Sequence, residues 1–347
     1  MLRQLKTFTQ LGLLALSVTM ISPIQAADLP EHSQLVDIGN KRLHVRAMGL
    51  DKAGPAIVLL SGPNYNFHSD SAWFSALQGT LARHNKVYAI DRAGNAWSDF
   101  DENASYRLFV DDLYQVLAQL GESQVIFVAF SSANITTRLF VEKYSNNANM
   151  DIKGMLWVDP DIIQPHSIAL YQDYPVSWYR EYLDLLLPHI ETGAWLERTM
   201  DKINLEREEV QALVSSKGLA CSNKKLDWAY FDRVTQRRLL IENQQTRAIE
   251  IANYHDDLEA VRNLPLLNSI PVSVIDSDFE LKDIAEATEP EQIARLTRWM
   301  EEGTAWSQQV ASVSDGQYIP LTDSDHLVPI EHPRRIKKAI RWLLRKR

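Results

Sequence analysis

The sequence predicts an α/β fold in which a mostly parallel sheet is covered by helices on both faces and carries a helical insertion. Short, wholly apolar runs of strand length recur along the chain, as expected of strands buried on both faces. Segments with helical spacing of apolar residues separate these runs, which favours parallel strands joined by helices. About one hundred residues, 161–265, contain no strand-like run. The apolar runs are residues 56–60, 87–90, 125–130, 155–158 and 271–275.

The first 26 residues have the pattern of a secretory signal peptide. Arg3 and Lys6 supply a positive start, and Leu11–Ile21 is an apolar stretch too short to span a bilayer comfortably. The small residue Ala26 marks a cleavage site. We therefore expect export to a periplasmic or secreted location, with an uncleaved anchor as the alternative and no membrane span in the mature chain.

Charge and cysteine content narrow the class of partner. The 347-residue chain has 36 basic and 45 acidic residues, and loss of Arg3 and Lys6 with the leader leaves 34 basic residues and a net charge of −11. Nucleic-acid binding requires a basic face, so we exclude this partner class. Cys221 is the only cysteine. The exported chain therefore has no internal disulfide, which suits a periplasm-like compartment.

The first core segment, residues 27–160, begins with two strands joined at a Gly-Asn turn. His44 lies in the second strand, which alternates polar and apolar residues, and we expect it to be a solvated position. The buried strand Ala56–Leu60 ends in a Gly- and Pro-containing loop. Such a loop lies at the carboxyl edge of the sheet, where open α/β folds place ligands. Helical spacing follows at Trp73–Leu81 and at Ser105–Leu120.

The insertion, residues 161–265, is predicted to form a helical cap rich in Trp and Tyr. Its apolar spacing indicates helices at Trp178–Leu187, Glu206–Val214 and Leu226–Arg262. Sheet character then returns in the second core segment, residues 266–347. That segment is predicted to contain a strand at 271–275, a helix at Pro290–Met300, a last strand at Tyr318–Leu321 and a closing helix from Pro333.

A serine lies on a sharp turn between the apolar run 125–130 and the helical pattern that follows it. This strand–turn–helix layout is that of a nucleophile elbow, in which the serine hydroxyl stands clear of the sheet. The residues two before and two after the serine must be small. Ala129 and Ala133 satisfy this for Ser131, whereas Ser132 would be flanked by Phe130 and Asn134. We therefore assign Ser131 as the nucleophile, with the Ser132 N–H facing an oxyanion.

A serine, an acid and a histidine follow in the order used by one class of hydrolases. Ser131 comes first, an acidic residue follows a later strand, and His326 follows the last strand. A serine hydroxyl is a weak nucleophile until a base takes its proton. The histidine is that base, and the acid holds its tautomer and stabilises the imidazolium.

The chain resembles the α/β-hydrolase superfamily, in particular its cap-bearing members with a serine nucleophile. The resemblance covers nearly all of residues 34–345 and depends on the order and spacing of several motifs. These are Leu59-Leu60-Ser61-Gly62, Tyr88 to Ser98, the elbow, Trp157-Val158-Asp159-Pro160, and Asp325 to Pro333. It implies an α/β-hydrolase fold with a helical cap and no cofactor.

The resemblance leaves the acid open. The family pattern after residues 271–275 aligns with Ser277 to Glu280 and nominates Glu280, while Asp278 lies two residues closer and keeps the aspartate chemistry. We rank these two equally. A minority of the family place the acid one strand earlier, which nominates Asp159 as the third choice.

Two features depart from the family pattern. Both glycines of the usual elbow are alanines, and Pro63 occupies the position that usually donates an N–H to the oxyanion. Proline has no N–H. Asn64 or Tyr65 would have to supply this donor, or the loop would have to shift, because the loss of one donor costs roughly 10²–10³ in rate.

The sequence therefore predicts an exported serine hydrolase acting on an ester, lactone or similar small acyl substrate. An aspartate nucleophile is disfavoured because Ser131 holds that position. The alternative is a weak or inactive α/β-hydrolase fold that binds a ligand or partner. His68 is expected to be exposed to solvent or to touch substrate. The remaining histidines show no paired-ligand spacing, so we expect no metal site.

Overall fold

The computed structural model describes residues 29–216 and 226–346. The expected signal peptide, residues 1–26, and Cys221 lie outside the described residues. None of the helices in residues 29–216 and 226–346 combines the length and the apolar composition that a transmembrane span requires.

One sheet of eight strands forms the centre of the described structure, in the order β1-β2-β4-β3-β5-β6-β7-β8. β1 and β2 pair antiparallel, as do β2 and β4, and every other pairing is parallel. The strand bounds are β1 Ser33–Asp37, β2 Arg42–Met48, β3 Ala56–Ser61, β4 Val87–Ile90, β5 Gln124–Phe130, β6 Asp151–Val158, β7 Val272–Asp276 and β8 Tyr318–Pro320. The predicted mostly parallel sheet is therefore confirmed.

Helices cover both faces of this sheet because its central strands are apolar on both sides. Successive side chains of a strand point to opposite faces. Accordingly, Ile57 and Leu59 of β3 join one buried cluster, and Val58 and Leu60 join another. The first cluster includes α1 and α12, and the second includes α2, α3 and α10. Their bounds are α1 Gln78–Leu81, α2 Phe109–Gln119, α3 Ala133–Tyr144, α10 Pro290–Val313 and α12 Pro333–Arg345.

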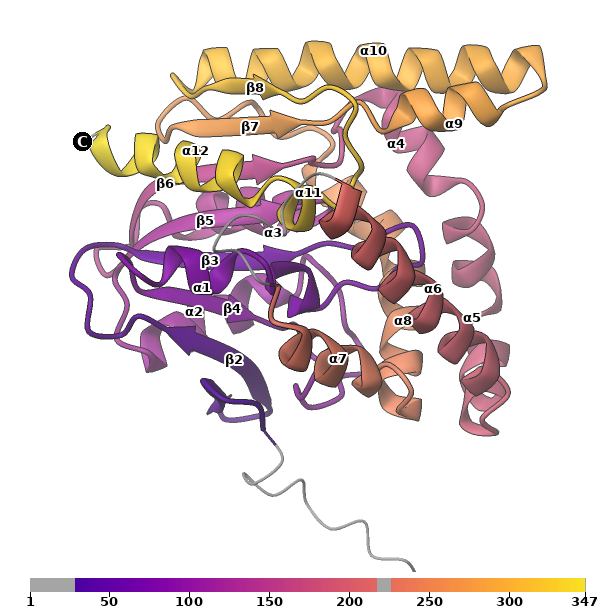
Figure 1. The fold of residues 1–347 in the computed structure, drawn as a ribbon, viewed down its shortest axis with the longest axis horizontal. Helices are drawn as coiled ribbons and strands as arrows, with labels where there is room; N and C mark the ends of the chain where they lie inside the picture. The colour runs from indigo at the N-terminus through magenta and orange to yellow at the C-terminus, as the bar shows by residue number, and fades with distance from the viewer. Residues whose placement is uncertain (1–28, 217–225, 347) are drawn as a thin grey trace, which may run out of the picture.

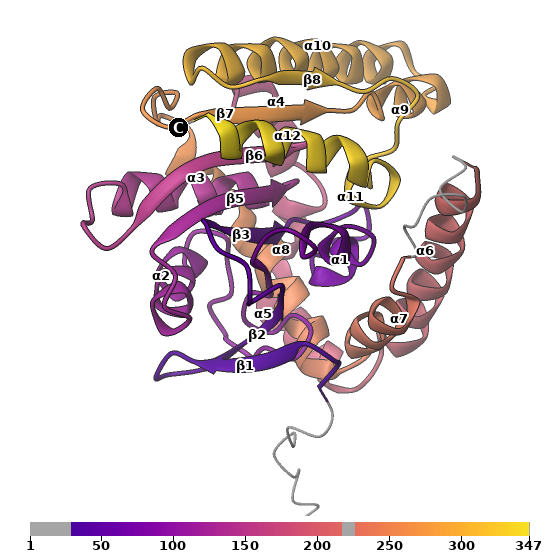
Figure 2. The ribbon, with the colours of Figure 1, turned by 60° about the vertical axis from the view of Figure 1, so that its left-hand side comes forward.

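Five helices follow β6 and precede β7 in the chain. They lie at the side of the sheet to which the parallel strands point (Figure 1). We call α4–α8 the cap. In Figure 2 the pair α6 and α7 stands away from the sheet, beyond its carboxyl edge. The cap helices are α4 Pro165–Gln172, α5 Val176–Glu191, α6 Leu196–Ser216, α7 Trp228–Arg237 and α8 Ile241–Val261. Short helices η2 Ser71–Phe74, α9 Glu280–Glu286 and α11 Val328–Glu331 complete the described elements.

Three local expectations need correction. The segment from Trp73 to Leu81 is split into η2 and α1, and α10 runs thirteen residues beyond the expected end at Met300. His44 is fully buried, not solvated, and its Nδ1 lies 2.7 Å from Asp91 Oδ2. Its strand, β2, pairs with β1 along one edge and with β4 along the other, and this pairing brings His44 Nδ1 to a carboxylate at the end of β4. Nε2 has no hydrogen-bond partner in the described residues.

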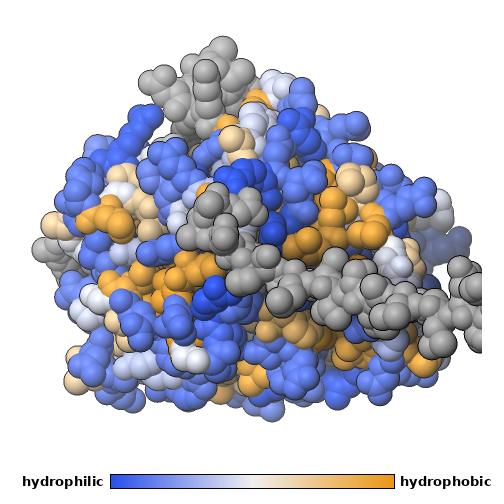
Figure 3. Space-filling model, turned by 90° about the horizontal axis from the view of Figure 1, so that it is seen from below, coloured by the Kyte–Doolittle hydropathy of each residue, from blue (hydrophilic) through white to orange (hydrophobic). Residues whose placement is uncertain are grey.

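The surface has the mixed character of an ordinary globular protein. On the face drawn in Figure 3, several separate apolar patches lie among mainly hydrophilic residues.

The described residues contain no group of three or more His, Cys, Asp or Glu side chains that could hold a metal ion.

Candidate active site

Ser131 occupies a sharp turn between β5 and α3. The strand ends at Phe130 and the helix begins at Ala133, so two residues make the connection. Ser131 has φ of 53°, in the left-handed region that is uncommon for a residue with a side chain. Its N–H donates to the Val158 carbonyl at 3.0 Å, and its own carbonyl accepts from the Asn134 N–H at 3.2 Å. The geometry is that of the expected elbow, with backbone strain stored at the serine.

Close packing explains the small residues around this turn. Ala129 and Ala133 are buried at 0% and 1% exposure. Gly62, in the loop after β3, also lies against the elbow. A Cβ added to Gly62 would lie 2.4 Å from the Ser132 nitrogen and 2.5 Å from the Phe130 oxygen. The Gly62 N–H donates to that same Phe130 carbonyl at 2.6 Å, so the loop after β3 is fixed to the elbow.

His326 is paired with a carboxylate from β6. Its Nδ1 lies 2.5 Å from Asp159 Oδ2. The same carboxylate accepts from the Ser277 N–H at 3.0 Å and from the Ser277 hydroxyl at 2.8 Å. Asp159 also has a left-handed φ, of 50°, where the chain turns away from the sheet. A carboxylate with three donors is firmly oriented and can hold the imidazole in one tautomer.

The expected ranking of the acids was wrong for this geometry. β6 lies directly beside β5 in the sheet, so the end of β6 reaches the histidine, whereas the end of β7 provides only the supporting Ser277. Asp278 instead accepts from the N–H groups of Asp323 and Ser324, at 2.9 and 3.0 Å. It therefore shapes the loop that carries His326 and does not bond the imidazole.

Glu280 lies at the start of α9 and is only 8% exposed. Its Oε2 has no hydrogen-bond partner among the described residues. Burial, together with the nearby charge of Asp159, raises the pKa of Glu280 to about 8. At neutral pH this carboxyl is mainly uncharged, so it does not supply the anion that an imidazolium needs.

The environment of His326 favours the protonated imidazole. Burial opposes the charge, but the hydrogen bond and charge of Asp159, with the charges of Asp161 and Asp325, raise the pKa of His326 to about 9. The imidazole lies between two aromatic rings, with centroid distances of 5.0 Å to Phe130 and 4.9 Å to Phe279. Since Phe130 directly precedes Ser131, this packing keeps the imidazole next to the elbow.

The other nitrogen of His326 faces a backbone carbonyl. Nε2 lies 3.3 Å from the Pro63 oxygen. Within the described parts of the chain, no hydrogen bond joins Nε2 to the Ser131 hydroxyl. Hydrogen bonds of this kind are often long or poorly aligned before substrate binds, so the arrangement keeps Ser131 and His326 as a candidate pair.

The two expected oxyanion donors have different environments. The Ser132 N–H lies at the start of α3 and donates to no acceptor in the described residues, so it can face an oxyanion. The Asn64 N–H instead donates to the His68 carbonyl at 3.0 Å. The prediction that Asn64 supplies a free donor is therefore wrong for this conformation, because the loop after Pro63 turns back on itself.

Two residues beside the elbow were missed by the sequence analysis. Asp161 Oδ2 accepts from the Ser132 hydroxyl at 2.6 Å and also from the Tyr254 hydroxyl of α8. Burial raises the pKa of Asp161 to about 6, although the Ser132 hydrogen bond and His326 oppose this rise. The Asp-Pro-Asp sequence at 159–161 was the available signal, but nothing in it places Tyr254 nearby.

A cap residue holds the loop after β3. Glu206 of α6 is fully buried and accepts from the Asn64 amide at 2.7 Å and from the Asn66 amide at 2.8 Å. Its carboxylate also contacts His68 Nδ1 at 2.9 Å and Arg238 at 2.5 Å. Burial favours the neutral acid, but the Arg238 charge and the hydrogen bonds from His68 and Asn64 lower the pKa of Glu206 far below its usual range. Glu206 is therefore the ionised centre of this contact.

His68 is 3% exposed, so the expectation of solvent exposure needs correction. Burial and the Arg238 charge lower its pKa to about 4, which makes the imidazole neutral at physiological pH. Nδ1 then donates to Glu206, and Nε2 accepts from Arg247 of α8 at 2.5 Å. His68 thus links the loop after β3 to two cap helices.

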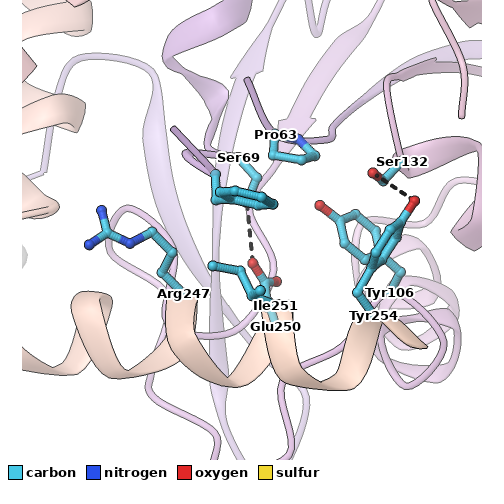
Figure 4. A pocket seen from close by; sticks show the side chains of 9 residues that line it. Pro63, Ser69, Tyr106, Ser132, Arg247, Glu250, Ile251 and Tyr254 are labelled. Carbon is cyan, nitrogen blue, oxygen red and sulfur yellow. Dashed lines mark hydrogen bonds between the residues drawn. The ribbon is translucent and has the colours of Figure 1, made fainter. Parts of the chain in front are cut away.

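A small cavity of about 30 Å³ lies beside the elbow, between Ser132 and α8. Figure 4 shows Tyr106 and Tyr254 close to Ser132, with Arg247, Glu250 and Ile251 along the same helix. The walls are mainly apolar and aromatic. Its lining residues are Pro63, Phe67, Ser69, Tyr106, Ser132, Arg247, Glu250, Ile251 and Tyr254.

Comparisons with solved structures support the fold. An epoxide hydrolase, CorEH, has a TM-score of 0.61 at 14% identity, over 91% of this chain and 99% of that one. An esterase from Thermogutta terrifontis has a TM-score of 0.56 at 19% identity, over 90% and 98%. A putative epoxide hydrolase from Pseudomonas aeruginosa has a TM-score of 0.57 at 14% identity, over 90% and 95%. At these identities the likeness shows a shared fold.

A search of curated proteins found no match to the chain. A family model described as "Alpha/beta hydrolase family" matches residues 57–339, which include the elbow, the cap and His326. This match spans most of the chain and supports hydrolase activity. The chain therefore belongs to the alpha/beta hydrolase family.

Proposed function

We propose that the protein is an exported serine hydrolase that cleaves an ester, lactone or similar small acyl compound. One observation carries the proposal: Ser131 lies on a strained elbow, and His326, held by Asp159 at 2.5 Å, packs beside it. Membership of the alpha/beta hydrolase family supports the hydrolytic class of reaction. The serine mechanism and the acyl substrate are our inference from the side chains.

In this mechanism His326 Nε2 takes the proton of the Ser131 hydroxyl while the oxygen attacks the substrate carbonyl. Asp159 stabilises the imidazolium that forms. The tetrahedral intermediate then collapses, His326 protonates the leaving alcohol, and an acyl-serine remains. Water, deprotonated by the same imidazole, attacks the acyl-serine and releases the acid.

The oxyanion in this scheme faces the Ser132 N–H at the start of α3, where the helix dipole also favours negative charge. In the described conformation the Asn64 N–H does not serve as the second donor, because it is bonded to the His68 carbonyl. We therefore propose that substrate binding moves this loop and exposes a second donor. His326 Nε2 would at the same time leave the Pro63 carbonyl for Ser131.

Epoxide hydrolysis is less well supported for this chain, although two of the three similar structures named above are described as an epoxide hydrolase or a putative one. Attack of a serine on an epoxide would produce an ether. An ether has no carbonyl carbon for water to attack, so the enzyme would not be regenerated. An ester or lactone produces an acyl-serine, which the same site can hydrolyse.

Covalent labelling with a fluorophosphonate probe tests the serine mechanism. We expect wild type and Ser132→Ala to label and Ser131→Ala to remain unlabelled, because only an activated serine reacts at an appreciable rate. Labelling that persists in Ser131→Ala would contradict the assignment. A positive result would justify a screen of small esters and lactones.

Export is proposed from residues 1–26 alone, with their positive start, apolar stretch and Ala26. Mass spectrometry of the protein purified from a bacterial periplasmic fraction is expected to give an N-terminus at Ala27. Recovery of the chain with residues 1–26 intact would contradict a cleaved leader.

The second candidate function is ligand binding by a hydrolase fold that is catalytically weak. Two observations favour it: the 3.3 Å contact of His326 Nε2 with the Pro63 carbonyl, and the Asn64 N–H that is occupied by His68. A folded wild-type protein that fails to react with the fluorophosphonate would support this candidate over the enzyme.

A further inference from the structure

A second cavity, of about 480 Å³, lies where the cap joins the core. Both chain connections between these parts line it: Ile163–Pro165 on the way into the cap and residues 261–267 on the way out. It shares no lining residue with the small cavity beside Ser132. Its size is within the range of small-molecule sites.

The inner wall of this hinge cavity contains two tryptophans, 3% and 4% exposed, and one unsatisfied polar atom. Trp157 of β6 and Trp306 of α10 both line it and stack on each other with a centroid distance of 5.7 Å. Asn134 of α3 also lines it and is only 1% exposed. Its Oδ1 has no hydrogen-bond partner in the described residues. Buried polar atoms are normally paired, so this acceptor requires an explanation.

The orientation of the Asn134 amide is fixed by its other end. Its Nδ2 donates to the Asp161 carbonyl at 2.8 Å. Turning the amide over would place Oδ1 against that carbonyl oxygen, which is repulsive. The unpaired atom is therefore an acceptor, and a ligand that satisfies it must bring a hydrogen-bond donor.

The charged residues of the hinge cavity already have protein partners. Arg138 donates to Glu142 at 3.1 Å and to the Pro265 carbonyl at 2.9 Å. Arg262 donates to Glu259 at 2.6 Å. An anionic ligand would have to compete with these contacts, and a cationic ligand would be repelled by the two guanidinium groups. The remaining class is a neutral molecule.

We propose that the hinge cavity binds a neutral molecule with an apolar, preferably aromatic, body and one hydroxyl or amide donor. The donor bonds Asn134 Oδ1, and the body lies against the tryptophans and the apolar residues of the two connections. Such a ligand contacts the core and both chain connections to the cap simultaneously. This site is separate from the proposed acyl chemistry and does not depend on it.

The test uses 2-phenylethanol and its methyl ether, which differ in the donor hydrogen. Dissociation constants are measured by NMR titration of the mature Ser131→Ala protein, so that turnover plays no part. We expect saturable binding of the alcohol and about tenfold weaker binding of the ether. Absence of saturable alcohol binding, or equal binding of the two probes, would overturn the proposal.

Two variants assign the binding to the hinge cavity. Asn134→Leu keeps the side-chain size and removes the acceptor, and it is expected to reduce the alcohol-to-ether preference from about tenfold to about one. Leu266→Trp fills the cavity from its outer connection and is expected to abolish binding. The matched control is Leu185→Trp, at a 70% exposed position on α5, which is expected to leave binding unchanged. Normal binding by Leu266→Trp would contradict the assignment.

Discussion

The two sides of the candidate active site are built in different ways. On the side of the nucleophile, Ser131 and Asp159 end neighbouring strands of the sheet, and His326 follows the last strand. On the side of the oxyanion, the loop after β3 is held by Glu206, a residue of the cap. The first side depends on the core alone, and the second depends on a buried charge contact between core and cap.

This difference has a functional consequence. Strand ends in a packed sheet are rigid, so the Asp159–His326 pair is preorganised. The Glu206 carboxylate, with the four groups that it contacts, fixes the loop from Asn64 to His68. Within this loop the Asn64 N–H donates to the His68 carbonyl. We infer that the cap controls the oxyanion side, whereas the Asp159–His326 pair is in place before substrate arrives and only the contact of Nε2 with the Pro63 carbonyl has to change.

The largest expected effect comes from the acid on the rigid side. Asp159→Asn is expected to lower kcat for a model ester such as p-nitrophenyl acetate by about 10³–10⁴, because the histidine loses its orienting charge. A loss smaller than tenfold would show that another carboxylate has this role.

The cap side is tested by Glu206→Gln. Removing one member of a buried charge contact typically costs about 3–5 kcal/mol, since Arg238 loses a partner that is 2.5 Å away. We expect a lower melting temperature and a loss of roughly 10–100-fold in kcat/KM through the displaced loop. Glu208→Gln, at an exposed position of the same helix, is the control and is expected to behave like wild type. An unchanged kcat/KM in Glu206→Gln would contradict the proposal that Glu206 holds the loop after β3 in place for catalysis.

The pH profile distinguishes the two sides further. A general base must be unprotonated, and the pKa of His326 is raised to about 9. We therefore expect kcat/KM to rise about tenfold per pH unit below pH 9 and to level off above it. The Ser131→Ala protein provides the blank for alkaline hydrolysis. A plateau that begins near pH 7 would mean that Asp159 and the neighbouring acids do not hold the proton on His326.

The smallest expected effect on rate is that of Glu280→Gln, below about threefold at pH 7, because this carboxyl is already mainly protonated there. Its effect on stability depends on pH. The pKa of Glu280 is raised by burial to about 8, so wild type loses stability as pH rises from about 4.5 to 8. The melting temperature of Glu280→Gln is expected to exceed that of wild type by more at pH 8 than at pH 5. The opposite trend would contradict a buried neutral carboxyl.

The elements with a strong local signal were predicted from the sequence. The spacing of Ala129, Ser131 and Ala133 predicted the turn, because only small residues fit where Gly62 and the helix approach it. The alternation of apolar runs and helical segments predicted the parallel sheet. These features depend on neighbours in sequence or on one simple pattern.

Partners across the sheet could not be predicted in the same way. The choice of Asp159 over Glu280 depends on β6 lying beside β5, and strand order is a property of the folded chain. His44 and His68 were misplaced for a related reason. Each is buried against a carboxylate that is distant in sequence, Asp91 and Glu206 respectively, and no local pattern indicates that pairing.

The most direct test of the proposed active site is a crystal structure of the mature protein after reaction with a fluorophosphonate. The account predicts phosphorus bonded to Ser131 Oγ and a phosphonyl oxygen facing the Ser132 N–H. It also predicts that His326 still bonds Asp159 while its Nε2 has left the Pro63 carbonyl. An adduct on another residue, or an Nδ1 bonded to Glu280 in place of Asp159, would contradict it.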